Sequence, residues 1–157
     1  MKSQRTHLIF SLSLIVLTVG FIWINSALPG QDSSELSGRF RDLLEKILEF
    51  IHCPQNTEAF LLTNVRKVAH AIEYAVIGLE LAILWVGLHK GFQGLWNAWS
   101  TVLAIAVFDE TIQLFATARG PQITDVLLDT ASGTLAILIV YAAANIIYSI
   151  RKSVKTE

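Results

Sequence analysis

Charged residues are scarce in this chain of 157 residues. Only 16% of the residues are Asp, Glu, Lys or Arg, whereas ordinary soluble domains contain about 25%. The single cysteine, Cys53, excludes an internal disulfide, and the formal net charge of −1 gives no reason to expect nucleic acid as a partner. Because 53% of the residues are hydrophobic and the mean hydropathy is positive, the composition predicts an integral membrane protein.

Long apolar stretches are abundant. A helix needs about 20 apolar residues to cross a bilayer, and four stretches approach or exceed that length. They cover residues of about 8–26, 68–88, 95–115 and 125–150. The first could also be a cleaved signal peptide, but its apolar core of about 18 residues exceeds the usual 7–15, so we expect a retained helix. The sequence thus predicts one all-α membrane domain, residues 1–157, built as a bundle of four transmembrane helices.

The loop between the first two stretches contains an amphipathic segment at about residues 33–51. Its apolar residues recur at helical spacing, and charged residues occupy the other face. The segment is too short and too charged to span, which predicts an interfacial helix on the extracytoplasmic side. A helix packed over the mouth of the bundle as a lid explains the same pattern equally well.

Basic residues near the ends of the spans predict the orientation. A count of Lys and Arg on the two sides is a tie, but the flanks of the first and last spans are almost purely basic, with Lys2, Arg5, Arg151, Lys152 and Lys155. Because basic residues are enriched in cytoplasmic flanks, both termini are predicted to be cytoplasmic.

Ionisable residues inside the apolar stretches lie at similar depths. At about 1.5 Å of rise per residue, Glu73 lies about 8 Å below the start of its span and Asp129 about 6 Å below Asp125. Asp109 lies about 9 Å before Phe115 at the end of its own span. Adjacent spans alternate in direction, so the three carboxylates should meet at one level, on the outer side in this orientation.

Residues around these carboxylates share helix faces, because positions three or four apart are neighbours on a helix. We therefore expect one polar site near the basic residue Arg66, formed by Lys67, His70, Glu73, Tyr74, Asp109, Glu110, Gln113, Arg119, Asp125 and Asp129. Small residues after Asp129, including Gly133, should allow close helix approach. Charged groups inside a membrane usually mark a functional site, although a purely structural salt-bridge network is the alternative. Glu80 lies deeper, and we expect it to be protonated or hydrogen-bonded between helices.

The ordered set of polar residues resembles the VanZ-like family of small bacterial membrane proteins. The residues that carry the resemblance are Lys67, His70, Glu73, Tyr74, Asp109, Glu110, Gln113, Arg119, Asp125 and Asp129, together with the segment Ser26-Ala27-Leu28-Pro29-Gly30. Ser132 stands where many members have glycine. The resemblance implies a location in the bacterial cytoplasmic membrane and a role in the cell envelope. The founding member of the family is associated with low-level resistance to the lipid-tailed glycopeptide teicoplanin.

Three functions compete. The first is a binding protein whose partners are membrane lipids and a lipid-linked envelope precursor or lipoglycopeptide, with Lys67, His70 and Arg119 meeting phosphate. The second is an intramembrane hydrolase or transferase, with the catalytic candidates His70, Glu73 and Asp109. This enzyme could use a divalent metal, for which the candidate ligands are His70, Glu73, Asp109, Asp125 and Asp129. No cofactor is required by the sequence. The third is a small transporter, for which Glu80 is the main support.

Overall fold

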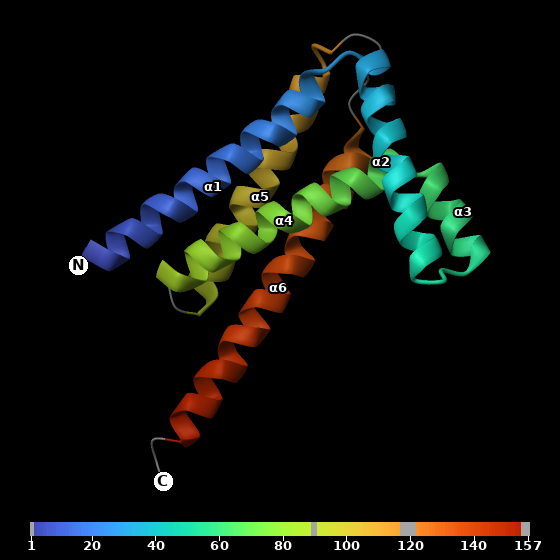
Figure 1. Ribbon diagram of the computed structural model, residues 1–157. Coiled ribbons are helices and arrows are strands. Elements are labelled where there is room, and N and C mark those ends of the chain that lie inside the picture. Colours follow the sequence, from blue (N-terminus) through green and yellow to red (C-terminus); the bar gives the residue numbers. More distant parts are fainter. Residues whose placement is uncertain (1, 89–90, 117–121, 155–157) are drawn as a thin grey trace.

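The computed structural model describes residues 2–88, 91–116 and 122–154. Across these residues the regular structure consists of six helices and contains no strand. The helices are α1 (Lys2–Ala27), α2 (Gly30–Phe50), α3 (Gln55–Thr63), α4 (Val65–Leu88), α5 (Phe92–Gln113) and α6 (Ile123–Ser153) (Figure 1). The prediction of an all-α chain is confirmed.

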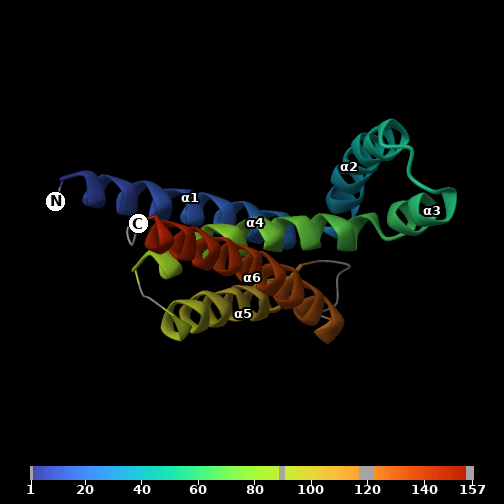
Figure 2. The same ribbon diagram turned by 90° about the horizontal axis from the view of Figure 1, so that it is seen from below.

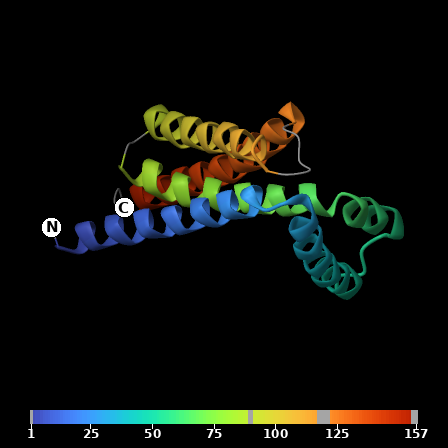
Figure 3. The same cartoon turned by 90° about the horizontal axis from the view of Figure 1, so that it is seen from above.

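Helix α4 is the centre of the bundle. It packs against both α5 and α6, and α1 lies along α4 and α5. Helices α2 and α3 form a hairpin at the end where α4 begins, and they lie opposite the start of α1 and the end of α6 (Figures 2 and 3). The start of α4, the end of α5 and the start of α6 therefore share one end of the bundle.

Among the described residues, three helices, rather than the predicted four, are long and apolar enough to cross a membrane. They are Arg5–Ala27, Val65–Leu88 and Ile123–Ser153. The span predicted at residues 95–115 is a helix, α5, which begins at Phe92 and ends at Gln113. With 22 residues α5 is long enough, but too many of its residues are polar. These residues are Gln93, Asn97, Asp109, Glu110 and Gln113.

The outer surface of the bundle is apolar. On α1, Phe10 is 67% exposed, Leu17 is 70% exposed and Ile24 is 66% exposed. The C-terminal half of α6 diverges from the other helices and exposes further large apolar side chains, such as Ile146 and Tyr148 (Figure 1). Soluble proteins rarely expose so much contiguous apolar surface, so this surface fits a multi-pass membrane protein.

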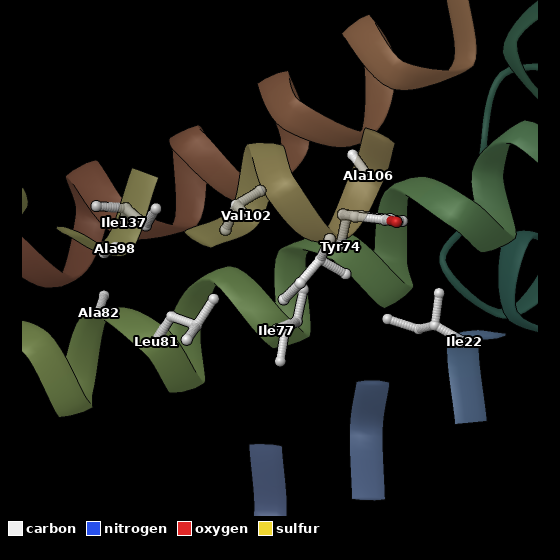
Figure 4. Packing of buried hydrophobic residues seen from close by; sticks show 10 residues of the cluster. Ile22, Tyr74, Ile77, Leu81, Ala82, Ala98, Val102, Ala106 and Ile137 are labelled. Carbon is white, nitrogen blue, oxygen red and sulfur yellow. The ribbon is translucent and has the colours of Figure 1, made fainter. Parts of the chain in front are cut away.

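The interior of the bundle is closely packed. Its buried residues include Ile22, Tyr74, Ile77, Leu81, Ala82, Ala98, Val102, Ala106 and Ile137 (Figure 4). Helices α4 and α6 approach most closely at Gly78 and Gly133, where a Cβ atom on Gly78 would lie 2.5 Å from the carbonyl oxygen of Gly133. The prediction of close approach near Gly133 is thus confirmed, and Gly78 is the partner that the sequence analysis missed.

The amphipathic segment predicted at residues 33–51 is helix α2. Part of its apolar face, Leu44 and Leu48, is buried against Leu62 of α3, a short helix that the sequence analysis did not predict. Other apolar residues on α2 stay exposed, including Leu43 at 55% and Ile47 at 47%. Because α2 also packs against α4, the hairpin covers part of the bundle at the start of that helix.

Glu80 joins α4 to α1. The hydroxyl of Thr18 donates a hydrogen bond of 2.9 Å to Glu80 Oε1, which confirms the hydrogen bond between helices that was expected for this carboxyl group. We expect Thr18→Val to lower the free energy of unfolding in detergent by about 1 kcal/mol, since hydrogen bonds between membrane helices contribute amounts of this order. Thr111→Val is the matched control, because among the described residues the Thr111 hydroxyl donates to the carbonyl oxygen of Val107, within its own helix. Equal losses in the two variants, measured by denaturant titration, would count against this role for Thr18.

Candidate functional site

Three helices bring His70, Asp109 and Asp129 together at one end of the bundle. Each residue offers one atom able to bind a metal ion, and these three atoms all lie within 4.8 Å of one another. His70 Nδ1 lies 3.9 Å from Asp129 Oδ2. His70 is 9% exposed and both aspartates are fully buried. The predicted convergence of α4, α5 and α6 is thus present in the structure. We call these three residues the inner cluster.

The close approach of α4 and α6 positions two members of this cluster. Asp129 lies one turn before Gly133, and His70 lies two turns before Gly78. Both helices begin at the same end of the bundle, and the close contact of Gly78 with Gly133 farther along holds them side by side. Larger residues at either glycine would move the imidazole away from the carboxylate.

Glu73 links the inner cluster to α1. Its Oε2 atom lies 3.9 Å from His70 Nδ1, and its Oε1 atom accepts a hydrogen bond of 3.2 Å from Asn25 Nδ2. The sequence analysis missed Asn25, because it treated the first stretch only as a membrane anchor. A signal was available: Thr18, Ile22 and Asn25 recur at helical spacing, and all three face α4 in the structure.

Gln113 orients the carboxylate of Asp109. Its side-chain nitrogen donates a hydrogen bond of 3.3 Å to Asp109 Oδ2, and its side-chain oxygen accepts one of 2.8 Å from Arg66 Nη2. The guanidinium fixes which side of the amide faces Asp109, since only the amide oxygen can accept from arginine. Arg66 and Gln113 therefore act on the inner cluster through Asp109.

Glu110 and Asp125 lie where α5 and α6 come together. Glu110 Oε2 accepts a hydrogen bond of 2.8 Å from the backbone N–H of Gln122, the residue that precedes α6. Asp125 is 7% exposed in the first turn of α6, and its Oδ1 atom accepts a bond of 3.4 Å from the Thr124 hydroxyl. Glu110 thus ties the start of α6 to α5, whereas the bond to Asp125 lies within the first turn of α6.

Two buried side chains at the site have polar atoms without a hydrogen-bond partner among the described residues. They are the hydroxyl of Tyr74 and both carboxylate oxygens of Asp129. Both residues are fully buried. The tyrosine ring packs near Ile77 while its hydroxyl oxygen points away from Leu81 (Figure 4). Burial of a polar atom without a hydrogen-bond partner is unfavourable in free energy, so these atoms indicate that a ligand binds at this site.

The cluster can be reached from one side. The side chains of His70 and Glu73 keep 11% and 20% exposure, and Arg66 beside them is partly exposed. Lys67 is exposed and does not belong to the buried group, whereas Arg119 lies outside the described residues. Five carboxylates, those of Glu73, Asp109, Glu110, Asp125 and Asp129, make this end of the bundle rich in acids.

The structure separates the candidate metal ligands. His70, Asp109 and Asp129 are the one group of three ligand-type residues close enough to share an ion in the described part of the chain. Glu73 lies beside His70 and is held by Asn25, and Asp125 lies one turn before Asp129. The geometry therefore favours three of the five predicted ligands.

A comparison with family models matches residues 10–147 to the family described as VanZ/LLP1. The match runs from within α1 to within α6 and so includes every described residue of the polar site. No curated protein and no solved structure matches the chain.

Proposed function

Because this chain belongs to the VanZ/LLP1 family, we propose that it is a cell-envelope protein that binds a phosphate-bearing lipid head group. The observation that carries the proposal is the polar cluster at one end of an otherwise apolar bundle, open beside His70 and Glu73. Arg66 and Lys67 precede it on α4 and offer cationic donors to a phosphate. The apolar surfaces of α1 and α4 would accompany the lipid tail.

We place the site at the outer surface of the cytoplasmic membrane. Arg151 and Lys152 are exposed at the end of α6, and Arg5 is exposed near the start of α1. These residues lie at the end of the bundle opposite the α2–α3 hairpin. Because basic residues favour the cytoplasmic side, the hairpin and the polar site would face outward.

The ligand class that fits this position is a membrane phospholipid or a lipid-linked precursor of the cell wall. Either one presents a phosphate at the depth of the head groups, where the site would lie. By holding such a molecule, or a lipoglycopeptide itself, the protein would modulate susceptibility to teicoplanin-type agents. That effect would be a consequence of head-group binding.

The proposal predicts selective binding of lipids that carry a phosphate. Purified protein in detergent should retain a polyprenyl phosphate or phosphatidylglycerol in native mass spectrometry, but should not retain the corresponding polyprenol. Arg66→Gln and Lys67→Gln should each weaken binding about tenfold, since a charge-assisted hydrogen bond contributes about 1.5–3 kcal/mol. Expressed in a susceptible bacterium, the same variants should lose any shift in the inhibitory concentration of teicoplanin.

Arg151→Gln is the matched control, because it removes the same charge at the opposite end of the bundle. It should bind the phosphate lipid as the wild type does. Equal retention of the polyprenol and its phosphate would contradict the proposal, and so would undiminished binding by folded Arg66→Gln protein.

A further inference from the structure

We propose that His70, Asp109 and Asp129 bind one divalent metal ion of the zinc or manganese class. The inference deepens the proposed function and rests on it, because the ion would be the group that receives the lipid phosphate. Imidazole and carboxylate together suit Zn²⁺ and Mn²⁺, whereas Mg²⁺ and Ca²⁺ prefer oxygen ligands alone. Three protein ligands leave at least one coordination position open for a phosphate oxygen.

The distances within the inner cluster are close to those of a metal site. Around a tetrahedral ion bound at about 2.1 Å, neighbouring ligand atoms lie about 3.4 Å apart. His70 Nδ1 and Asp129 Oδ2 are 3.9 Å apart, and the three candidate atoms lie within 4.8 Å of one another. Small rotations of buried side chains would close this difference without a change in the helices.

Asp129 and Tyr74 supply an independent observation. Both carboxylate oxygens of Asp129 lack a hydrogen-bond partner in the described part of the chain, although the residue is fully buried. A metal ion satisfies such a carboxylate by direct coordination. The Tyr74 hydroxyl, also buried and without such a partner, lies one turn after His70 and can donate to an anion held at the ion.

Residues around the inner cluster supply the outer contacts that metal ligands usually have. Gln113 donates to Asp109, and Arg66 fixes the Gln113 amide. Glu73 Oε2 lies 3.9 Å from His70 Nδ1, the nitrogen that would bind the ion, so Glu73 is a neighbour of the site and not an outer contact of the ring. Outer contacts such as those of Gln113 and Arg66 orient a ligating carboxylate.

A cation also explains how an acid-rich site could receive a phosphate. Glu73, Glu110 and Asp125 lie within about one turn of His70, Asp109 and Asp129 on α4, α5 and α6. These carboxylates would repel a phosphate that approached the inner cluster directly. A divalent ion offsets two negative charges and presents a positive centre to the head group.

The test is metal content of the full chain purified in detergent. Protein stripped with a chelator, loaded with Zn²⁺ or Mn²⁺ and freed of excess metal should hold about one ion per chain. His70→Ala and Asp129→Asn should each lower the affinity for the metal ion at least tenfold. Loss of a residue that merely contacts a metal ligand already lowers metal affinity by about that factor, so loss of a ligand should cost at least as much. Wild type that holds no metal after loading overturns the inference.

Two controls separate this site from adventitious binding. Asp42→Asn removes an exposed carboxylate on α2, outside the polar site, and should keep the ion. Cys53→Ser removes the one thiol of the chain and should also keep it. Metal lost from Cys53→Ser, or retained in full by His70→Ala and Asp129→Asn, overturns the assignment.

Stability measurements show whether a variant has merely unfolded. Metal should raise the melting temperature of wild-type protein and leave that of Asp129→Asn unchanged. Metal-free Asp129→Asn should melt close to metal-free wild type, because the substitution weakens the 3.9 Å contact with His70 but removes no hydrogen bond among the described residues. A lower melting temperature together with an intact metal response indicates a structural role and overturns the inference.

Lipid binding by stripped and loaded protein separates the two proposals. Loading should strengthen the retention of a polyprenyl phosphate. If the stripped protein binds the phosphate lipid as well as the loaded one, the metal inference fails and the proposed function stands. If the ion binds at the inner cluster and no phosphate lipid is retained, the proposed function fails and the metal site stands.

Discussion

Replacing Gly78 with alanine should push α4 away from α6 and destabilise the protein more than any other single methyl group added to α4. The new Cβ atom would lie 2.5 Å from the carbonyl oxygen and 2.7 Å from the Cα atom of Gly133. Both are backbone atoms that cannot move without the helix. Overpacking of this kind costs about 1–3 kcal/mol, and more where the backbone must shift. We expect a loss of about 3 kcal/mol in the free energy of unfolding.

Gly87 provides a matched control on the same helix. Nothing lies within 4 Å of a Cβ atom built there, so Gly87→Ala should be neutral or stabilising by up to about 1 kcal/mol, the gain in helix propensity. Gly133→Ala should also destabilise the protein, because its Cβ atom would lie 2.6 Å from a γ-methyl group of Val102, a buried and β-branched side chain, and 3.2 Å from the carbonyl oxygen of Tyr74. Denaturant titration in mixed micelles measures all three. A Gly78→Ala protein as stable as Gly87→Ala would show that the two helices do not cross at this glycine.

Separation of α4 and α6 should also disturb the polar site. His70 and Asp129 reach each other from the two helices that Gly78 and Gly133 hold together. Gly78→Ala protein that remains folded should therefore lose metal and phosphate-lipid binding, although the substitution lies two turns from His70. Gly87→Ala should retain both.

Substitutions of Tyr74 should separate its structural role from its role at the site. The ring is fully buried in the core, so Tyr74→Ala should cost about 3–5 kcal/mol through the lost contacts and the cavity. Tyr74→Phe keeps the ring and removes a hydroxyl that has no hydrogen-bond partner among the described residues. Its stability should equal or exceed that of the wild type, because a buried polar group without a partner costs about 1–3 kcal/mol.

If the Tyr74 hydroxyl donates to a bound head group, Tyr74→Phe should weaken phosphate-lipid binding about tenfold while the fold is kept. Tyr148→Ala is the control for ring removal, since Tyr148 is 67% exposed on α6 and should change neither property. Binding by Tyr74→Phe at the wild-type level would limit Tyr74 to packing. A stability loss in Tyr74→Phe similar to that of Tyr74→Ala would instead reveal a hydrogen bond to its hydroxyl.

Helix positions were largely predictable because they depend on local pattern. The apolar stretches predicted at 8–26, 68–88 and 125–150 lie within α1, α4 and α6, and the amphipathic segment at 33–51 overlaps α2. The prediction at residues 95–115 was right that this segment is helical, but wrong that it is apolar enough to cross a membrane. The polar residues of α5 suit the interior of a bundle but make the helix less able to cross a bilayer. A prediction based on the length of the segment alone does not take these residues into account.

The residues of the site were also predictable as a set, because ionisable groups in apolar helices are few and helical rise fixes their depth. The hydrogen-bond partner of each residue within the site was not predictable. The structure assigns Glu110 to the start of α6, Gln113 to Asp109, and Glu73 to Asn25. Those pairings depend on how helices are rotated and how closely they pack, which spacing along one helix does not contain.

The sequence by itself determined a helical membrane protein with its ionisable residues at one end, because composition, helical period and rise per residue are local properties. Only the tertiary structure decided that α1 contributes Asn25 and Thr18. It also decided that His70, Asp109 and Asp129 form the inner cluster, while Lys67 stays exposed. The physical reason is the contact of Gly78 with Gly133, which sets the rotation and separation of α4 and α6 through backbone atoms far apart in the chain.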